Sequence, residues 1–201
     1  MTRRSGVRIS GGRFRGRSVP VPGTARPTSA RLREALFDIW RDRVLGVRFL
    51  DLFAGSGAVG LEALSRGASF VVFVENDRDA VRRLQAVCAE LAPDSTSVLQ
   101  ADLPAQMSRA RHPGEGRYDL IFADPPYAFA EYGELVASLG ELLAEGGELA
   151  IEHSVRRELP NSVEGLVCQG SRNYGENQIT FFAAGPGMTS REPVTNQQLR
   201  K

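Results

Sequence analysis

The sequence has few of the residues on which several classes of protein depend. Its two cysteines, Cys88 and Cys168, are too few and too far apart for a disulfide framework or a zinc site, and we expect no bound metal. No apolar run approaches the roughly 18 residues of a membrane helix, and the longest clear one covers residues 70–74. The basic N-terminus lacks the apolar stretch of a secretory signal. We therefore expect a cytoplasmic protein that does not bind membranes, with one principal core in 201 residues.

Acidic residues are absent from the first 33 positions, although the whole chain is almost neutral. This stretch holds nine arginines, whereas the remaining residues carry 16 basic and 24 acidic side chains, a net charge of −8. Lys201 is the only lysine, so a general preference for arginine explains the kind of cation but not the missing acids. Such asymmetry favours a polyanionic partner, most simply a nucleic acid. The candidate contacts are Arg8, Arg13, Arg15, Arg17 and Arg26.

The N-terminal segment predicts two short extended pieces followed by a helix. Residues 7–10 and 13–19 both alternate with a period of two, and two glycines separate them, which is typical of a hairpin. Thr28 or Ser29 is suited to cap a helix that ends near Trp40. These signals divide the chain into a basic arm at residues 1–27, a main domain at 28–184 and a polar tail at 185–201.

From Arg48 onward, predicted strands alternate with predicted helices. Several strands are almost continuously apolar, as strands covered on both faces are. The pattern predicts an α/β domain of the Rossmann-like type, with a seven-stranded, mostly parallel sheet and an antiparallel C-terminal hairpin. The expected strands are 49–53, 70–75, 97–100, 118–123, 148–152, 166–170 and 178–183, and the expected helices are 59–66, 79–91 and 134–143.

A glycine-rich turn follows the first of these strands and opens a helix. The segment DLFAGSGAVG at residues 51–60 has the spacing of nucleotide-binding loops, whose glycines let a ligand approach backbone N–H groups. Glu75 ends the next strand, twenty residues after Gly55, where a carboxylate can accept hydrogen bonds from ribose hydroxyls. A nicotinamide dinucleotide fits the same pattern, and a turn that only packs a helix is the structural alternative.

Two acids bear on the choice of cofactor. Asp51 precedes the turn, where a carboxylate suits the ammonium group of an amino-acid moiety better than it suits a pyrophosphate. Asp102 follows the third strand and is placed to pair with an adenine amino group. Both features favour a nucleoside joined to an amino acid over a dinucleotide.

The strongest chemical signal is Asp124-Pro125-Pro126-Tyr127, directly after the fourth strand. The two prolines remove backbone donors and fix φ, which leaves carbonyl oxygens that join the Asp124 carboxylate as acceptors for an exocyclic amine. Tyr127 offers a ring on which a base can stack. A dehydrogenase needs no such acceptors; the structural alternative is a strand-ending turn with a core tyrosine.

These motifs together resemble a known family. The segment DPPY is similar to the (Asn/Asp)-Pro-Pro-(Tyr/Phe) motif of class I amino methyltransferases, which use S-adenosylmethionine. The segments RISGGRFRGR at residues 8–17, RPTSARLRE at 26–34 and LDLFAGSGAVGLEALSRGA at 50–68 are similar to the RsmD family. The likeness extends from about residue 7 to residue 183. Members of that family methylate N2 of one guanine in 16S ribosomal RNA.

The resemblance implies a role for each matching residue. Asp124 and the Pro125 carbonyl would hold the target amine and Tyr127 would stack on the base, while the arm arginines would bind the RNA. Neither His112 nor His153 is expected near this motif, and both would be surface or structural residues. The implied catalytic residues are Asp124, Pro125, Pro126 and Tyr127, and the implied cofactor-binding residues are Thr28, Arg31, Asp51, Phe53, Ala54, Gly55, Ser56, Gly57, Glu75, Asn76 and Asp102.

The implied partner is 16S ribosomal RNA, within the small subunit or an assembly intermediate, and the expected state is a monomer. One rival is an amino methyltransferase that acts on a DNA base or on a protein glutamine. The short chain leaves no room for a separate DNA-recognition domain, and the acid-free arm favours a phosphate backbone over a protein. Another rival is a nucleic-acid-binding protein on an inactive methyltransferase fold, which the intact glycine turn and DPPY motif disfavour.

Overall fold

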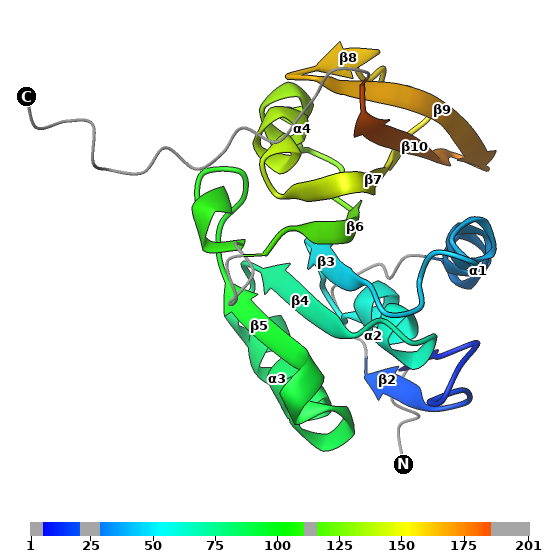
Figure 1. Ribbon diagram of the computed structural model, residues 1–201. Coiled ribbons are helices and arrows are strands. Elements are labelled where there is room, and N and C mark those ends of the chain that lie inside the picture. The colour runs from blue at the N-terminus through cyan, green and yellow to red at the C-terminus, as the bar shows by residue number, and fades with distance from the viewer. Residues whose placement is uncertain (1–5, 21–28, 111–115, 186–201) are drawn as a thin grey trace, which may run out of the picture.

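The computed structural model describes residues 6–20, 29–110 and 116–185. A large mixed sheet forms its centre, helices cover both faces of the sheet, and a two-stranded sheet lies beside α2 (Figure 1). The α-helices are α1 Ala30–Ile39, α2 Ala58–Ser65, α3 Arg78–Leu91 and α4 Tyr132–Gly140. The strands are β1 Gly6–Arg8, β2 Ser18–Pro20, β3 Arg48–Leu52, β4 Phe70–Glu75, β5 Thr96–Gln100, β6 Tyr118–Ala123, β7 Leu143–Ser154, β8 Ser162–Val163, β9 Leu166–Tyr174 and β10 Asn177–Ala184.

The main sheet has the order β5-β4-β3-β6-β7-β10-β9-β8. The ladders from β5 to β7 are parallel, whereas those that join β7, β10, β9 and β8 are antiparallel. The α/β class, the parallel half and the C-terminal hairpin are therefore confirmed. All seven expected strands are present, and the two-residue β8 adds an eighth to the edge of the sheet.

The junction between α4 and β7 differs from the sequence prediction by several residues. The helix expected over residues 134–143 ends at Gly140, and Leu143 already begins β7, five residues before the predicted strand. Leu142 and Leu143 are both buried in the core cluster on that face, so their apolar character alone does not distinguish a helix end from a strand start.

The second arm strand is also shorter than predicted. Residues 13–16 form a turn, and pairing begins only at Ser18. Gly12 and Gly16 adopt positive φ angles of 74° and 85°, which suit glycine and interrupt an extended chain. The backbone N–H groups of Arg13 and Phe14 bond to Ser65 at the end of α2 instead of to a partner strand. The expected hairpin exists, but in the segment predicted as its second strand residues 13–16 form a turn that is hydrogen-bonded to Ser65, and only Ser18–Pro20 is a strand.

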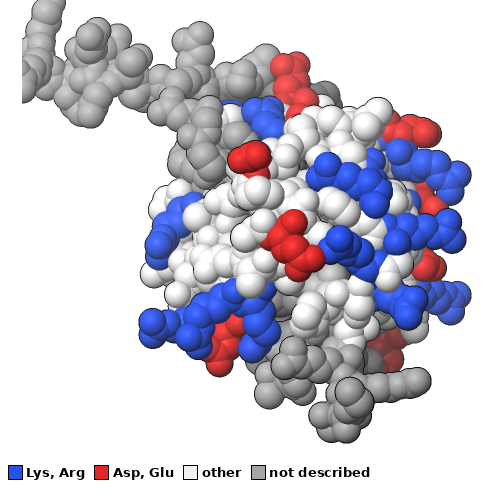
Figure 2. All heavy atoms as spheres, turned by 90° about the horizontal axis from the view of Figure 1, so that it is seen from below, with Lys and Arg blue, Asp and Glu red and all other residues white. Residues whose placement is uncertain are grey.

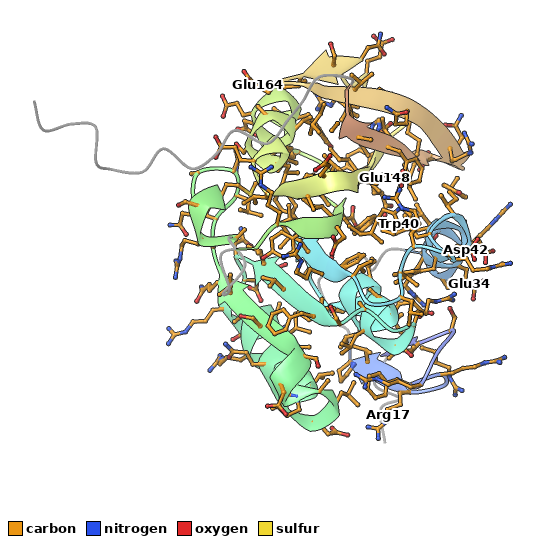
Figure 3. All side chains as sticks on the ribbon, in the orientation of Figure 1. Arg17, Glu34, Trp40, Asp42, Glu148 and Glu164 are labelled. Carbon is orange, nitrogen blue, oxygen red and sulfur yellow. The ribbon has the colours of Figure 1, made fainter. Side chains whose placement is uncertain are left out.

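The core divides into two clusters, one on each face of the sheet. On the α1 side, the Trp40 ring packs edge-on against Phe49 and Phe181, with centroids 5.8 Å and 6.3 Å apart. Its indole N–H donates to Glu148 Oε1 on β7 across 2.5 Å, so the buried ring keeps a polar partner (Figure 3). This contact fixes α1 against the centre of the sheet. Ser29 caps α1, because its hydroxyl accepts from the Leu32 N–H at 3.1 Å.

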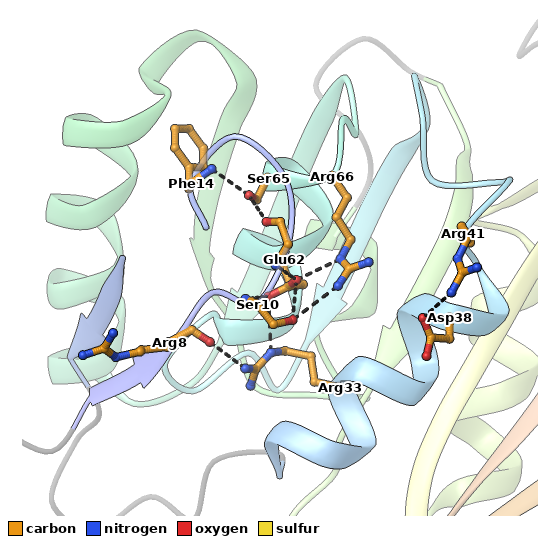
Figure 4. A network of polar contacts seen from close by, with 10 residues as sticks. Arg8, Ser10, Phe14, Arg33, Asp38, Arg41, Glu62, Ser65 and Arg66 are labelled. Atoms are coloured by element: carbon orange, nitrogen blue, oxygen red, sulfur yellow. Dashed lines mark hydrogen bonds and ion pairs between the residues drawn. The ribbon is translucent and has the colours of Figure 1, made fainter. Parts of the chain in front are cut away.

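The arm packs on the main domain through both apolar and polar contacts. Ile9 and Val19 are buried in the α1-side cluster. The buried Glu62 carboxylate of α2 accepts from the Ser10 N–H at 2.8 Å, the Ser10 hydroxyl at 2.9 Å and the Gly11 N–H at 2.8 Å (Figure 4). Arg66 Nε donates to the same carboxylate at 2.8 Å. The arm is therefore held at a fixed position against α2.

Candidate active site

The polar residues predicted for the site lie at one edge of the sheet. Asp51, Glu75 and Asp124 lie at or just beyond the carboxyl ends of β3, β4 and β6. The chain reverses its direction of strand addition between β3 and β6, and such a switch point opens a crevice at the carboxyl ends of the strands. The fold thus gathers residues that are more than seventy positions apart in the sequence.

The glycine turn begins beside a buried carboxylate. Asp51 is 2% exposed, and its Oδ2 accepts from the Gly60 N–H at 2.8 Å in the first turns of α2. Burial raises the pKa of Asp51 well above its usual range, and the nearby Asp124 and Glu75 carboxylates raise it further, against the opposing effect of the Gly60 hydrogen bond. A cation placed here would stabilise the ionised carboxylate.

The glycines of this turn lack a side chain for different physical reasons. A Cβ on Gly57 would stand 2.4 Å from Leu84 Cδ1, and one on Gly60 would stand 2.3 Å from Phe73 Cε1, so both allow α2 to pack closely. At Gly55, a Cβ would meet only the Phe53 carbonyl at 4.0 Å. Packing therefore accounts for two glycines, while the open space beside Gly55 permits the approach of a ligand.

Glu75 organises the neighbouring backbone. Its Oε2 accepts from the Gly55 N–H at 2.7 Å, and its Oε1 accepts from the N–H groups of Asn76 and Asp77 at 2.9 Å and 2.8 Å. These bonds tie the glycine turn to the start of α3. Each carboxylate oxygen can accept more than one hydrogen bond, so a ribose contact stays compatible with this arrangement.

The structure places the remaining predicted cofactor residues, Thr28 excepted, after three neighbouring strands and on α1. Phe53 has a positive φ of 56°, a strained backbone state for a non-glycine residue, and its ring packs edge-on against Phe129 at 5.5 Å. Ala54 and Ser56 are half-buried, and the exposed Asn76 and Asp102 follow β4 and β5. Arg31 is exposed on α1, and Thr28 lies outside the described residues.

The DPPY segment leaves β6 and turns sharply. The Phe129 N–H donates to the Pro126 carbonyl at 2.8 Å, which closes the turn, and the buried Phe129 ring packs against Tyr132 at 5.1 Å. Pro125 is buried, whereas Tyr127 is 71% exposed. The alternative of a core tyrosine is therefore wrong, because this ring is available to a ligand.

A cavity of about 210 Å³ opens beside this turn. Asp124, Pro125 and Tyr127 form part of its wall. The rest comes from residues that the sequence did not single out, on α4, β7, β10 and the segment after β7: Tyr132, Glu152, Ser154, Arg156, Arg157 and Asn177. The pairing of β6 with β7 and of β7 with β10 brings Glu152, Ser154 and Asn177 to the motif, so no local signal marks these three.

His153 also lines this cavity, so the prediction that it is distant from the motif is wrong. The prediction of a structural role agrees with its contacts. Its Nδ1 donates to the Ser154 carbonyl at 3.1 Å, and its Nε2 accepts from the Thr180 hydroxyl at 2.8 Å. Burial lowers the pKa of His153, which favours this neutral form. His112 lies outside the described residues.

The arm arginines present a basic surface on the β1–β2 side of the molecule. Arg8, Arg13, Arg15 and Arg17 are exposed, and Arg26 lies outside the described residues. The Arg13 guanidinium lies 4.4 Å from the centroid of the Phe14 ring, and Arg17 pairs with Glu90 at 2.6 Å. Figure 2 shows arginine side chains spread over this lower face with fewer acids between them.

The arm also reaches the glycine turn. Val19 and Pro20 of β2 line a hollow of about 10 Å³ together with Gly55 and Ser56. This proximity is not evident from the sequence, where the two segments are more than thirty positions apart. Strand β2 of the arm and the predicted cofactor turn therefore adjoin.

Two further observations concern the described part of the chain. It contains no group of three or more histidine, cysteine, aspartate or glutamate side chains placed to hold a metal ion. Within the same residues, no helix combines the length and the apolar character needed to cross a bilayer.

Comparison with known proteins identifies clear relatives. The family described as Conserved hypothetical protein 95 (Cons_hypoth95) matches residues 7–183. The chain is 37% identical to the Ribosomal RNA small subunit methyltransferase D of Escherichia coli over 123 residues, a match that covers 60% of each protein. It is 32% identical to the Putative rRNA methyltransferase YlbH of Bacillus subtilis, over 88% of this chain and 98% of that one.

A solved structure agrees with these sequence matches. The Putative methyltransferase yhhF from Escherichia coli superposes with a TM-score of 0.78 and 31% identity. The superposition covers 90% of this chain and 99% of that one. The family match over residues 7–183 extends from β1 to β10.

Proposed function

Because the chain belongs to the RsmD-like family described as Conserved hypothetical protein 95, we propose that it transfers a methyl group from S-adenosylmethionine to the exocyclic N2 of a guanine in 16S ribosomal RNA. The names of its relatives support a ribosomal RNA substrate. A substrate of this kind, within the small subunit or a precursor of it, would place the enzyme in the cytoplasm.

One observation carries this proposal. Asp124 lines the cavity walled by Tyr127, and its carboxylate is close enough to the buried Asp51, which precedes the glycine turn, to raise the pKa of that residue. A methyltransferase needs such a junction, because the methyl donor and the acceptor amine must meet in line at one atom. The exposed ring of Tyr127 supplies a stacking surface on the acceptor side.

The residues present fit S-adenosylmethionine. The open space at Gly55 admits a ligand, and the buried Asp51 carboxylate suits its ammonium group. Glu75 ends β4, which pairs with β3, and Asp102 follows β5, which pairs with β4; the two side chains would take the ribose and the adenine. When bound, the cofactor supplies an electrophilic methyl group on a sulfonium.

The chain itself activates the acceptor. The lone pair of a guanine amine is delocalised into the ring, so the amine is a poor nucleophile. Hydrogen bonds from its N–H groups to Asp124 and to the Pro125 carbonyl would return electron density to nitrogen and stabilise the charge that develops on it. The N2–CH3 bond would form as the S–CH3 bond breaks, S-adenosylhomocysteine would leave as the product, and the methylated amine would lose one of its protons by way of Asp124 to water. Such a proton is acidic, so no strong base is needed, and we give the neutral, hydrogen-bonded His153 no role as a base.

Transfer of a labelled methyl group tests the proposal. The protein is incubated with tritiated S-adenosylmethionine and, in parallel, with naked 16S ribosomal RNA, small subunits from a strain that lacks the enzyme, double-stranded DNA and a protein extract. We expect label in one or both ribosomal samples only. Label in DNA or protein alone would overturn the assignment of the substrate, and no transfer to any sample would overturn the activity.

A further inference from the structure

Three polar residues form a row along the wall of the cavity, and the first of them, Asp124, belongs to the DPPY motif. Asp124 follows β6, Glu152 lies near the end of the adjacent β7, and Asn177 begins β10 on the far side of β7. All three line the same cavity. The row begins beside the proposed cofactor space and leads away from it, so it follows the direction in which an acceptor base would extend.

The second and third residues of the row form a fixed pair. Asn177 Nδ2 donates to Glu152 Oε1 across 2.6 Å, and Glu152 is 4% exposed. This bond sets the orientation of the amide, because the carboxylate oxygen can only accept. The pair thus presents an acceptor, the carboxylate, next to a donor, the second N–H of the same amide group.

We propose that Glu152 and Asn177 select guanine as the acceptor base, with Glu152 accepting from N1–H and Asn177 donating to O6. This inference rests on the proposed function. Guanine carries N2, N1 and O6 in that order along one edge, as two donors followed by an acceptor. The protein row of Asp124, Glu152 and Asn177 offers two acceptors followed by a donor.

The same row disfavours the other bases that carry an amine. Adenine has a bare N1 acceptor beside its N6 amine, and cytosine has a bare N3 acceptor beside its N4 amine. Either would direct a lone pair at the Glu152 carboxylate. A site built to hydrogen-bond a donor rejects an analogue that lacks it, because a buried carboxylate oxygen then faces a lone pair instead of an N–H group.

The structural alternative is that Glu152 only fastens the start of β10 through Asn177. The two roles predict different behaviour toward 2-aminopurine, which keeps the N2 amine but has a bare N1 and no O6. Loss of a structural tie would lower activity on every base equally. Loss of a base contact would change the ratio between guanine and 2-aminopurine.

The test uses synthetic RNA fragments that span the methylated guanine and carry either guanine or 2-aminopurine at that position. The full-length protein, Glu152→Gln and the matched control Glu176→Gln are compared by kcat/KM for methyl transfer. Glu176 is exposed, precedes Asn177 in the sequence and does not line the cavity. Thermal melting of each variant monitors folding.

We expect the unmodified protein to prefer guanine over 2-aminopurine by at least about tenfold, the discrimination given by one good base contact. Glu152→Gln should reduce or reverse that ratio, because the amide can donate to a bare N1, and Glu176→Gln should leave it unchanged. Equal use of both bases by the unmodified protein would overturn the inference, even if Glu152→Gln fails to fold. An unchanged ratio in a folded Glu152→Gln would also overturn it. Absence of transfer to any guanine RNA would instead contradict the proposed function.

Discussion

Arg33 of α1 and Glu62 of α2 form an ion pair at a point where solvent scarcely reaches either side chain. Arg33 Nε lies 3.6 Å from Glu62 Oε2, and the two side chains are 1% and 0% exposed. Arg33 also donates to the Arg8 carbonyl of the arm at 2.7 Å. Burial lowers the pKa of Arg33, and Glu62 opposes that effect. The pair therefore joins the arm, α1 and α2 in one buried network (Figure 4).

Glu62→Gln should lower the free energy of unfolding by about 3–5 kcal/mol, because it leaves a buried guanidinium without its counter-charge. The measurement is urea denaturation followed by circular dichroism. Arg33→Met in the same background should recover part of the loss, since it removes the uncompensated charge. If Glu62→Gln unfolds at the wild-type urea concentration, the network does not stabilise the fold.

The arm arginines should govern the salt dependence of RNA binding. Arg13→Ala with Arg15→Ala removes two exposed cations and leaves the buried Ile9 and Val19 in place. We expect weaker binding to a 16S fragment and a slope of log affinity against log salt that is shallower by about 0.7–0.9 for each lost phosphate contact. Arg172→Ala on β9 is the matched control. An equal change of slope in the control would show that the effect is not specific to the arm.

Asp51→Asn should weaken cofactor binding without loss of stability near neutral pH. The raised pKa of Asp51 means that the folded state binds its proton more tightly than the unfolded state does. The stabilisation from this group is complete below the usual carboxyl range and is lost as pH rises through the raised pKa. Asparagine can still accept from the Gly60 N–H and has no charge to bury.

The melting temperature of Asp51→Asn, relative to wild type, should therefore be higher at about pH 8 than at about pH 4. Calorimetry with S-adenosylmethionine measures the loss of affinity in the same protein. A greater destabilisation at the higher pH would contradict the sign of the pKa shift.

Tyr127 and Asp124 should have separable effects on turnover. Asp124→Ala should lower kcat for RNA methylation about a hundredfold or more, the scale for losing one well-placed electrostatic partner. Tyr127→Phe should retain most activity and Tyr127→Ala should lose much of it. Because Tyr127 is 71% exposed, neither substitution of Tyr127 should change stability by more than about 0.5 kcal/mol, or lower the melting temperature by more than about 2 °C. Wild-type turnover by Tyr127→Ala would exclude stacking on this ring.

The sequence predicts the parallel half of the sheet well, because buried strands such as β4 are short apolar runs between polar turns. It also indicates the glycine turn and the DPPY segment, since each lies within a few consecutive residues. The cavity wall beyond Tyr127 is different. Glu152 and Asn177 are 25 positions apart and meet only through the register of β7 and β10. No periodicity or motif encodes that contact.

The position of the arm is the other feature that local patterns miss. Nine arginines without acids indicate a polyanion, but they do not show that Ser10 and Gly11 bind a buried glutamate on α2. In the sequence, Glu62 is only the single acid of a mostly apolar helix, and nothing there indicates its contacts with the arm. Its four hydrogen-bond donors come from the arm and from its own helix, its ion-pair partner Arg33 comes from α1, and only the assembled fold brings them together.

The central claim is that the acceptor is the N2 amine of a guanine in 16S ribosomal RNA. The most direct measurement is mass spectrometry of the nucleosides released from 16S RNA, isolated from small subunits that were treated with the protein and S-adenosylmethionine. We expect one new N2-methylguanosine per RNA, absent when Asp124→Ala replaces the wild-type protein. A methylated adenosine or cytidine, or no new methylated nucleoside, would contradict it.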